Sequence, residues 1–244
     1  MRDMDSRVVP AEAKKPRIRW AYNIISAILG ITIVMPIALI LAFRFVPVPA
    51  TPQMASVALG GQGVHYRWVE PADISPALVR AVIASEDQKF CMHHGFDWDS
   101  INSALRVHDR GGRLRGASTI SQQTARSLFL LPVRSWVRKG MEAYLTVLVE
   151  FLWPKKRILT AYLNLANWGH GNFGADAAAQ AYFETSAAKL TPEEASRLAA
   201  ILPDPDKWRA ADPGPYVARR SVTVVSRMGE VRRDDLDSCV QPWL

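Results

Sequence analysis

The chain has 244 residues, of which 49% are hydrophobic and 22% charged, and this balance excludes a largely disordered protein. The formal net charge is +7, which favours anionic partners such as acidic lipid headgroups, diphosphates or nucleic acid without choosing among them. The two cysteines, Cys91 and Cys239, match no metal-binding spacing. They could bridge in an oxidising compartment, although two cysteines in a chain of this length are more often unpaired, and the sequence leaves open whether these two pair.

No charged residue occurs from Trp20 to Phe43. A helix of these 24 residues would span about 36 Å at ~1.5 Å per residue, enough to cross a hydrocarbon core of about 30 Å. We interpret residues 20–43 as a retained signal anchor, because a buried core helix rarely runs so far without charge; a cleaved signal peptide, with a shorter apolar region, is the remaining alternative. Basic side chains crowd residues 1–19, so the positive-inside rule predicts a cytoplasmic N-terminus and a body outside the membrane.

Residues 44–63 contain three prolines and are predicted to be a linker that keeps the body near the bilayer. The body, residues 64–230, is predicted to be mainly α-helical and to be followed by a tail at 231–244. Apolar spacing and capping residues predict its helices at 75–86, 98–107, 135–153, 158–163, 191–202 and 216–228, with another from Ser118 or Thr119. The helix at 135–153 is expected to be the longest, and 64–69 is the best strand candidate.

Carboxylates and histidines crowd into the segment that follows the first of these body helices, which contains Glu86, Asp87, His93 and His94. A carboxylate at a helix end beside a cleft is a candidate acid or base, because partial burial raises its pKa. The alternative is a solvated helix end. Adjacent histidines project in different directions, so this pair is not expected to share a metal ion.

The next polar segment opens another predicted helix, where Ser118 and Thr119 follow a glycine. Hydroxyls at a helix start favour an anion site, although such caps are common for structural reasons alone. Gln122 and Gln123 add amide donors that suit sugar hydroxyls.

A basic cluster then precedes a carboxylate, with Arg134, Arg138 and Lys139 followed by Glu142. Arg138 and Glu142 lie four residues apart on one helix face. They form either a surface ion pair that contributes little to stability, or part of a phosphate-binding cluster to which arginine is suited.

In their order, these segments resemble the motifs of family 51 glycosyltransferases, the peptidoglycan transglycosylase domain. The resemblance covers about residues 65–210 and fits the monofunctional biosynthetic type of proteobacteria, because too little chain follows the last motif for a transpeptidase domain. The matching motifs are Glu86-Asp87-x-x-Phe90-x-x-His93-x-Gly95, Gly116-x-Ser118-Thr119-Ile120-x-Gln122-Gln123, Arg138-Lys139-x-x-Glu142, segment 158–174 and segment 190–205. The sequence departs from the family pattern, which usually has glycine, lysine and asparagine there, at Ala117, Arg126 and Ser127.

The resemblance implies a lysozyme-like, mainly α-helical head with a small membrane-proximal jaw, preceded by one transmembrane helix. It implies a peptidoglycan polymerase of the inner membrane that serves cell-wall biogenesis and cell shape, with its catalytic domain in the periplasm. The growing glycan on undecaprenyl diphosphate would be transferred to the 4-hydroxyl of lipid II, with inversion to a β-1,4 bond. Moenomycin, a mimic of the diphosphate lipid, blocks this family.

The same resemblance assigns roles to the site residues. Glu86 would be the general base, and Glu142 a second catalytic carboxylate that organises cations or holds Mg²⁺ or Mn²⁺ on the diphosphate; no organic cofactor is expected. Binding of the sugars and the diphosphate is assigned to Ser118, Thr119, Gln122, Gln123, Arg126, Arg134, Arg138 and Lys139. Support of the site is assigned to Asp87, Phe90, His93 and Gly95. Tyr162 is expected to pack, and Asn164 to cap a helix.

The expected partners are lipid II, the undecaprenyl-diphosphate-linked glycan, the cytoplasmic membrane and proteins of cell division or elongation. Nucleic acid is not expected, because the basic body lies outside the cytoplasm. Residues 107–131 mix arginines with Leu128, Phe129 and Leu131, and these apolar side chains either contact the membrane interface or enter the core. Two rival functions are a lysozyme-type hydrolase or lytic transglycosylase, and a non-catalytic anchored scaffold that binds the lipid-linked precursor.

Overall fold

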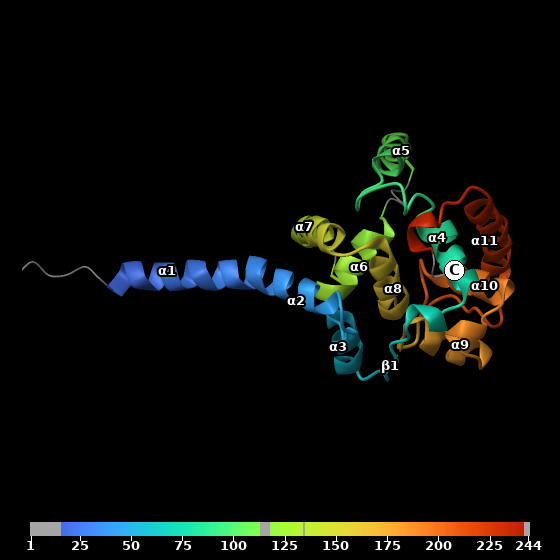
Figure 1. Cartoon of the computed structure of the whole chain (residues 1–244), viewed down its shortest axis with the longest axis horizontal. Helices are drawn as coiled ribbons and strands as arrows, with labels where there is room; N and C mark the ends of the chain where they lie inside the picture. The colour runs from blue at the N-terminus through green and yellow to red at the C-terminus, as the bar shows by residue number, and fades with distance from the viewer. Residues whose placement is uncertain (1–15, 113–117, 134, 242–244) are drawn as a thin grey trace, which may run out of the picture. The chain divides into compact units, whose positions relative to one another are not determined.

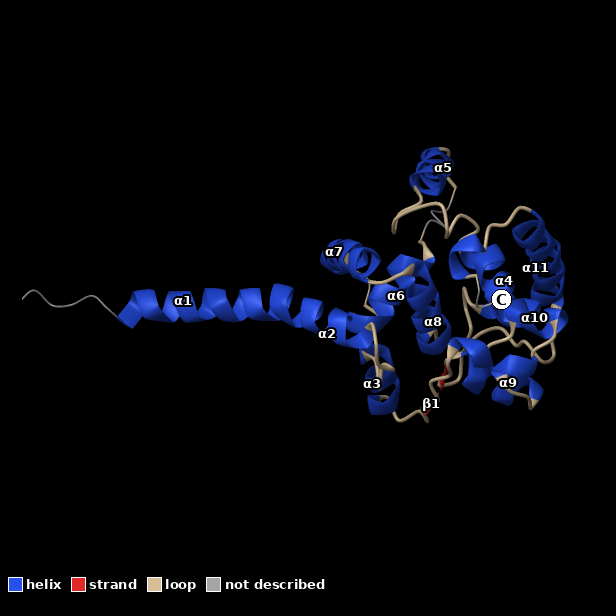
Figure 2. Ribbon diagram, viewed as in Figure 1, coloured by secondary structure: helices blue, strands red, loops and turns tan. Residues whose placement is uncertain are grey.

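The computed structural model of the chain describes residues 16–112, 118–133 and 135–241. The described part is mostly helical (Figure 2), as the sequence predicts. The chain divides into two compact units, Met1–Leu39 and Ile40–Leu244. The first holds most of an N-terminal helix, and the second holds the folded body with its single hydrophobic core.

The N-terminal helix runs through α1 (Pro16–Leu29), a π-helical stretch η1 (Gly30–Val34) and α2 (Met35–Phe43). Within it, the 22 residues Tyr22–Phe43 are long and apolar enough to cross a membrane. The π-helical stretch lies just before Pro36, whose ring excludes a regular hydrogen bond to the preceding turn. Thr32 donates its hydroxyl to the Ile28 carbonyl at 2.7 Å, so this polar group is satisfied inside the helix.

The predicted linker at 44–63 contains a helix that the sequence interpretation missed, α3 (Pro52–Leu59). The Thr51 side chain caps it by accepting from the Met54 amide at 3.2 Å, and Pro52 occupies its first turn. Val48 and Met54 are buried. This segment therefore belongs to the packed body and is more than a spacer.

The head is built on α4 (Pro76–Glu86), which packs against α10 (Pro192–Ile201) and α11 (Pro215–Arg233), as Figure 1 shows. Its predicted start is confirmed, because Ser75 caps the helix and Pro76 follows at the first position. The capping box of α10, formed by Thr191 and Glu194, is also confirmed. The 19 residues of α11 exceed the 17 of α7 (Trp136–Leu152), so the expectation that the helix at 135–153 is the longest is wrong.

A second group of helices consists of α6 (Ile120–Phe129), α7 and α8 (Lys155–Leu165), with α6 in contact with both others. Thr119 and Gln122 form a capping box at the start of α6, and Ser135 caps α7. Asp97 caps α5 (Trp98–Asp109), in which no residue is buried. The exposed α5 lies between the first two motifs, where the resemblance implies the jaw.

Of the strand candidate at 64–69, only His65–Tyr66 forms a strand, β1. It pairs in parallel with β2 (Asn172–Phe173). Gly171 has a φ of 77°, and a Cβ there would lie 1.9 Å from the Gly63 carbonyl oxygen, so only glycine permits this approach. The remaining elements are α9 (Ala175–Phe183), η2 (Pro71–Asp73), η3 (Ala187–Lys189) and η4 (Ser238–Val240).

The buried Asn164 does not cap a helix, contrary to expectation. Its amide donates to the carbonyls of Val69 at 3.0 Å and Thr160 at 2.9 Å, and its Oδ1 accepts from the Val69 amide at 2.8 Å. Asn164 thereby takes the place of a strand partner for Val69, which explains why the extended segment needs no further sheet.

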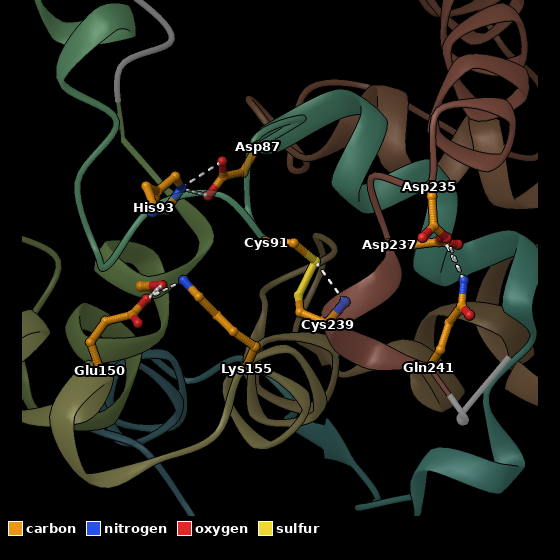
Figure 3. Close-up of a disulfide and its surroundings, with 10 residues drawn as sticks. Asp87, Cys91, His93, Glu150, Lys155, Asp235, Asp237, Cys239 and Gln241 are labelled. Atoms are coloured by element: carbon orange, nitrogen blue, oxygen red, sulfur yellow. Dashed lines mark hydrogen bonds and ion pairs between the residues drawn. A yellow bond between two sulfur atoms is a disulfide. The ribbon is translucent and has the colours of Figure 1, made fainter.

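Cys91 and Cys239 form a disulfide, with their Cα atoms 5.4 Å apart (Figure 3), which answers the question of pairing that the sequence left open. The bond fastens η4 to the loop after α4. An ion pair supports it, because Arg80 Nε lies 2.9 Å from the buried carboxylate of Asp237. The C-terminal segment is thus held on the body beside the loop that carries the first motif.

We predict that replacing both cysteines by serine lowers the free energy of unfolding by about 2–4 kcal/mol, because the disulfide closes a long loop. Denaturant titration under oxidising conditions measures this difference. The wild-type chain treated with reductant should have the same free energy of unfolding as the double variant. Reductant should not change the free energy of unfolding of the double variant. An unchanged midpoint for the double variant would show that the bond does not stabilise the fold.

Candidate active site

Glu86 ends α4 and is largely buried, with 13% of its side chain exposed. Gln123 donates to its Oε2 at 3.0 Å, and Ser85 donates to its Oε1 at 3.3 Å. Burial raises the pKa of Glu86, and the hydrogen bond from Gln123 and the charge of Arg220 offset part of this effect. A carboxylate with a raised pKa that still accepts hydrogen bonds is well suited to accept a proton.

A pocket of about 240 Å³ opens beside Glu86. It brings together residues from α4, the loop after α4, the start of α5, the segment before α6, and α11, among them Glu86, Lys89, Ser100, Ser118, Thr119 and Arg227. Its lining is predominantly polar, as a site for a hydroxyl-rich ligand requires. Glu86 therefore faces a groove and not open solvent.

Asp87, the next residue, joins the two segments that carry the first two motifs. His93 Nε2 lies 2.9 and 3.0 Å from its two carboxylate oxygens, and the Ile120 amide donates to Oδ2 at 3.0 Å. Figure 3 shows Asp87 and His93 pointing toward one another. Asp87 is buried, so its role in this geometry is to fix the loop after α4 to the first turn of α6.

Gly95 supplies the expected turn, with a φ of 90°. Its carbonyl accepts the Thr119 hydroxyl at 2.6 Å. A Cβ at this position would lie 3.0 Å from Thr146 Cγ2 and 3.1 Å from Glu150 Cγ, so a side chain would press on α7. Glycine thus permits the loop to approach both helices closely.

The four polar side chains predicted to bind sugar are not equivalent. Ser118 and Thr119 line the pocket, and Gln123 contacts Glu86 directly. Gln122 is 4% exposed, and its amide oxygen accepts from the Thr119 backbone at 3.0 Å as part of the capping box. The structure therefore gives Gln122 a role in the fold, away from the pocket lining.

Phe90 and Tyr162 lie under the site. Phe90 is fully buried, and the Lys155 ammonium is 4.5 Å from the centre of its ring. Tyr162 packs as expected, and its hydroxyl lies 3.4 Å from the amide oxygen of Gln123. The Tyr162 contact helps to hold Gln123 in reach of Glu86.

A second pocket, of about 260 Å³, is lined by Arg126 and Arg138 together with Gln53 and three apolar residues of the α6–α7 connection, Leu130, Pro132 and Val133. The charge of Arg126 also lowers the pKa of Glu86, which places this guanidinium within electrostatic reach of the carboxylate. Arg126 is thus common to the basic pocket and the surroundings of Glu86, and it retains the positive charge of the lysine usual in the family pattern.

Glu142 is completely buried and bonds two cations. Arg138 Nη1 lies 2.6 Å from its Oε2, and Lys139 forms a close ion pair with its Oε1. The alternative of a surface ion pair is therefore wrong. The carboxylate fixes the guanidinium that lines the basic pocket, and the cost of burying it is offset by both partners.

The surroundings of Glu142 do not fit a metal ion. Both of its oxygens already face cations, and a divalent ion would meet their repulsion. Across 16–112, 118–133 and 135–241, no group of three or more histidine, cysteine, aspartate or glutamate residues is arranged to hold a metal. Arg134, Gly116 and Ala117, which the sequence analysis also singled out, lie outside the described residues.

Two arginines of α11 belong to the site, and the sequence interpretation missed both. Arg220 Nη2 lies 4.0 Å from Glu86 Oε1 and 3.1 Å from the Ser85 hydroxyl, and Arg227 lines the pocket beside Glu86. They are seven residues apart and so share one helix face. That spacing, visible in the sequence, places both arginines on one side of a helix. No local pattern indicates which face of α11 packs against α4.

Comparison with known proteins places these residues in context. A family model described as "Transglycosylase" matches residues 53–229. A protein of Caulobacter vibrioides named biosynthetic peptidoglycan transglycosylase is 49% identical over 222 residues, which cover 91% of this chain and 97% of the relative. Proteins of the same name from Rhodospirillum centenum and Pseudomonas aeruginosa are 49% and 47% identical, over 88% and 82% of this chain and 94% and 88% of their own lengths.

We predict that Arg220→Gln raises the pKa of Glu86 further, because it removes a positive charge that favours the carboxylate. Carbon-13 NMR titration of the labelled carboxyl group measures the change. The matched control is Arg219→Gln, since Arg219 is exposed on the same helix. An unchanged or lower pKa in Arg220→Gln would contradict the electrostatic coupling.

Proposed function

The chain belongs to the transglycosylase family, and we propose that it is a peptidoglycan glycosyltransferase that polymerises glycan strands from lipid II. The observation that carries this proposal is the position of Glu86, a hydrogen-bonded and largely buried carboxylate beside a polar pocket and within electrostatic reach of Arg126. This arrangement meets the two needs of glycosyl transfer from a diphosphate: a base for the attacking hydroxyl and cations for the leaving group.

In the proposed reaction, Glu86 accepts the proton of the acceptor's sugar 4-hydroxyl. The 4-oxygen then forms a bond to the anomeric carbon of the donor sugar, while the bond from that carbon to the diphosphate oxygen breaks. Attack from the face opposite the leaving group inverts an α-linked diphosphate to a β-1,4 glycosidic bond. General-base assistance of this kind contributes about 10²–10⁴-fold to the rate.

The leaving undecaprenyl diphosphate gathers negative charge as the bond breaks. Arg126 and Arg138 line one pocket and offer guanidinium groups that bind phosphate oxygens in pairs. Arg134 completes this proposed set. Glu142 acts as a positioning residue, because its buried carboxylate holds Arg138 and Lys139 in place. A divalent ion, if the reaction uses one, would arrive on the diphosphate oxygens of the substrate.

The sugars are proposed to bind along Ser118, Thr119 and Gln123, of which the first two line the pocket beside Glu86 and the third contacts its carboxylate. Asp87 and His93 keep the motif-one loop against α6. The cations also separate this proposal from a hydrolase of the lysozyme type, which needs one catalytic glutamate but no diphosphate site.

The proposed topology is a cytoplasmic segment 1–19, a retained anchor at 20–43 and a catalytic body in the periplasm. The disulfide supports it, because such bonds persist in oxidising compartments and rarely in the cytosol. Leu131, Val133, Trp136 and Val137 are exposed around the α6–α7 connection, which suits a membrane interface. Leu128 is instead buried, so the two alternatives for residues 107–131 apply to different side chains.

We predict that Glu86→Gln lowers the rate of lipid II polymerisation by about 10²–10⁴-fold, because the amide cannot accept the proton. Lipid II binding should persist, since the substitution preserves shape. The assay uses the full chain in detergent with lipid II, with moenomycin as an inhibitor, and Glu193→Gln serves as a control at an exposed position. Wild-type-like turnover in Glu86→Gln would overturn the role of Glu86 as general base. Lipid II binding without polymerisation by the wild-type chain would favour a scaffold, and cleavage of finished glycan without polymerisation would favour a hydrolase.

The topology is tested by the cysteines themselves. In Gram-negative cells lysed directly into denaturing acid, we expect Cys91 and Cys239 of the full chain to resist a maleimide-polyethylene glycol reagent until reductant is added. Oxidation in the periplasm explains this protection. Labelling of both thiols without reductant would place the body in the cytoplasm and overturn the proposed orientation.

A further inference from the structure

Two side chains, one just after α7 and one in α8, hold the segment that leaves the N-terminal helix by donating to its backbone carbonyl groups. Trp153 Nε1 donates to the Ile40 carbonyl at 2.7 Å. Arg157 donates through Nε to the Phe43 carbonyl at 2.8 Å and through Nη2 to the Val46 carbonyl at 2.5 Å. Phe43 ends α2, so its carbonyl needs a partner outside the helix, and these bonds connect residues 40–46 to Trp153 and Arg157.

Two further hydrogen bonds hold the residues between α2 and α3 on the body. The Tyr66 hydroxyl donates to the carbonyl of the buried Val48 at 2.5 Å, and burial raises the pKa of Tyr66 to about 12, so it remains a donor at neutral pH. Arg44 returns a hydrogen bond to the Leu152 carbonyl at 2.7 Å. Residues 40–48 therefore form a strap, which we call the juxtamembrane strap, with contacts to β1 and to the α7–α8 region.

The strap is followed by α3, which contributes Gln53 to the lining of the pocket that contains Arg126 and Arg138. Thr51 and Met54 on either side of Gln53 are buried, and α3 packs against α6. Gln53 is thereby held at the rim of the pocket that Arg126 and Arg138 line. A neutral amide at this place adds a hydrogen-bond donor without adding charge.

We propose that α3 is part of the lipid-diphosphate site and that Gln53 donates its side-chain amide to a phosphate oxygen of the lipid-linked substrate. The proposal rests on the proposed function, because it takes the diphosphate as the occupant of the basic pocket. Its physical basis is that α3 is held at its start by the strap and the Thr51 cap, and along its length by packing against α6, so the amide is positioned before substrate arrives. The segment between the N-terminal helix and β1 would thus bind the same ligand whose charge the arginines neutralise.

The test is a charge series at one position in the full chain. Gln53→Glu removes the donor and adds a negative charge, so KM for lipid II should rise about tenfold or more, while kcat changes less. Gln53→Lys restores a donor and should keep KM near the wild-type value, with a steeper dependence on salt. The KM of Gln53→Ala should lie between the values of the Glu and Lys variants.

The control is Gln62→Glu, the same substitution at an exposed position outside the pocket, which should leave KM unchanged. Thermal midpoints establish that all variants fold. If Gln53→Glu matches Gln62→Glu while the wild-type chain polymerises lipid II, this inference is overturned and the proposed function stands. Equal losses in the Glu, Lys and Ala variants would reduce Gln53 to a structural role and overturn it as well. Absence of polymerisation by the wild-type chain would instead overturn the proposed function.

Discussion

The site depends on keeping one carboxylate largely out of water without leaving it unpartnered. Glu86 ends a helix whose apolar residues Leu78–Ala84 are mostly buried, and α6 and α11 contribute Gln123 and Arg220 as its partners. Burial alone would favour a neutral acid, and the two partners restore part of the preference for the ionised form. The balance of these effects suits Glu86 to the proposed role of proton acceptor, beside one pocket and within electrostatic reach of Arg126, which lines the other.

That balance requires loops far apart in the sequence to hold fixed positions. Asp87 ties the loop after α4 to the first amide of α6, and Thr119 ties the same helix start to the Gly95 turn. Glu150 extends this support below, where it accepts from Lys155 at 2.7 Å and from Ser121 (Figure 3). Each of these groups is satisfied by its neighbours, so the polar network rigidifies the site.

The cations are arranged by the same rule that buried charges need partners. Glu142 is the counter-charge that allows Arg138 and Lys139 to stand together despite their repulsion. The juxtamembrane strap adds a mechanical constraint, since it makes the exit of the N-terminal helix part of the body that bears the pocket.

The sequence by itself determined the features that arise from residues close together in the chain. The apolar span, the Ser75-Pro76 helix start and the capping boxes at Thr119 and Thr191 depend on spacings of a few residues. Only the tertiary structure decided the Cys91–Cys239 bond, the approach of Arg220 to Glu86 and the place of Gln53 beside Arg126. The physical reason is that these pairings depend on which helix faces pack together, and amphipathic spacing marks an apolar face without naming its partner.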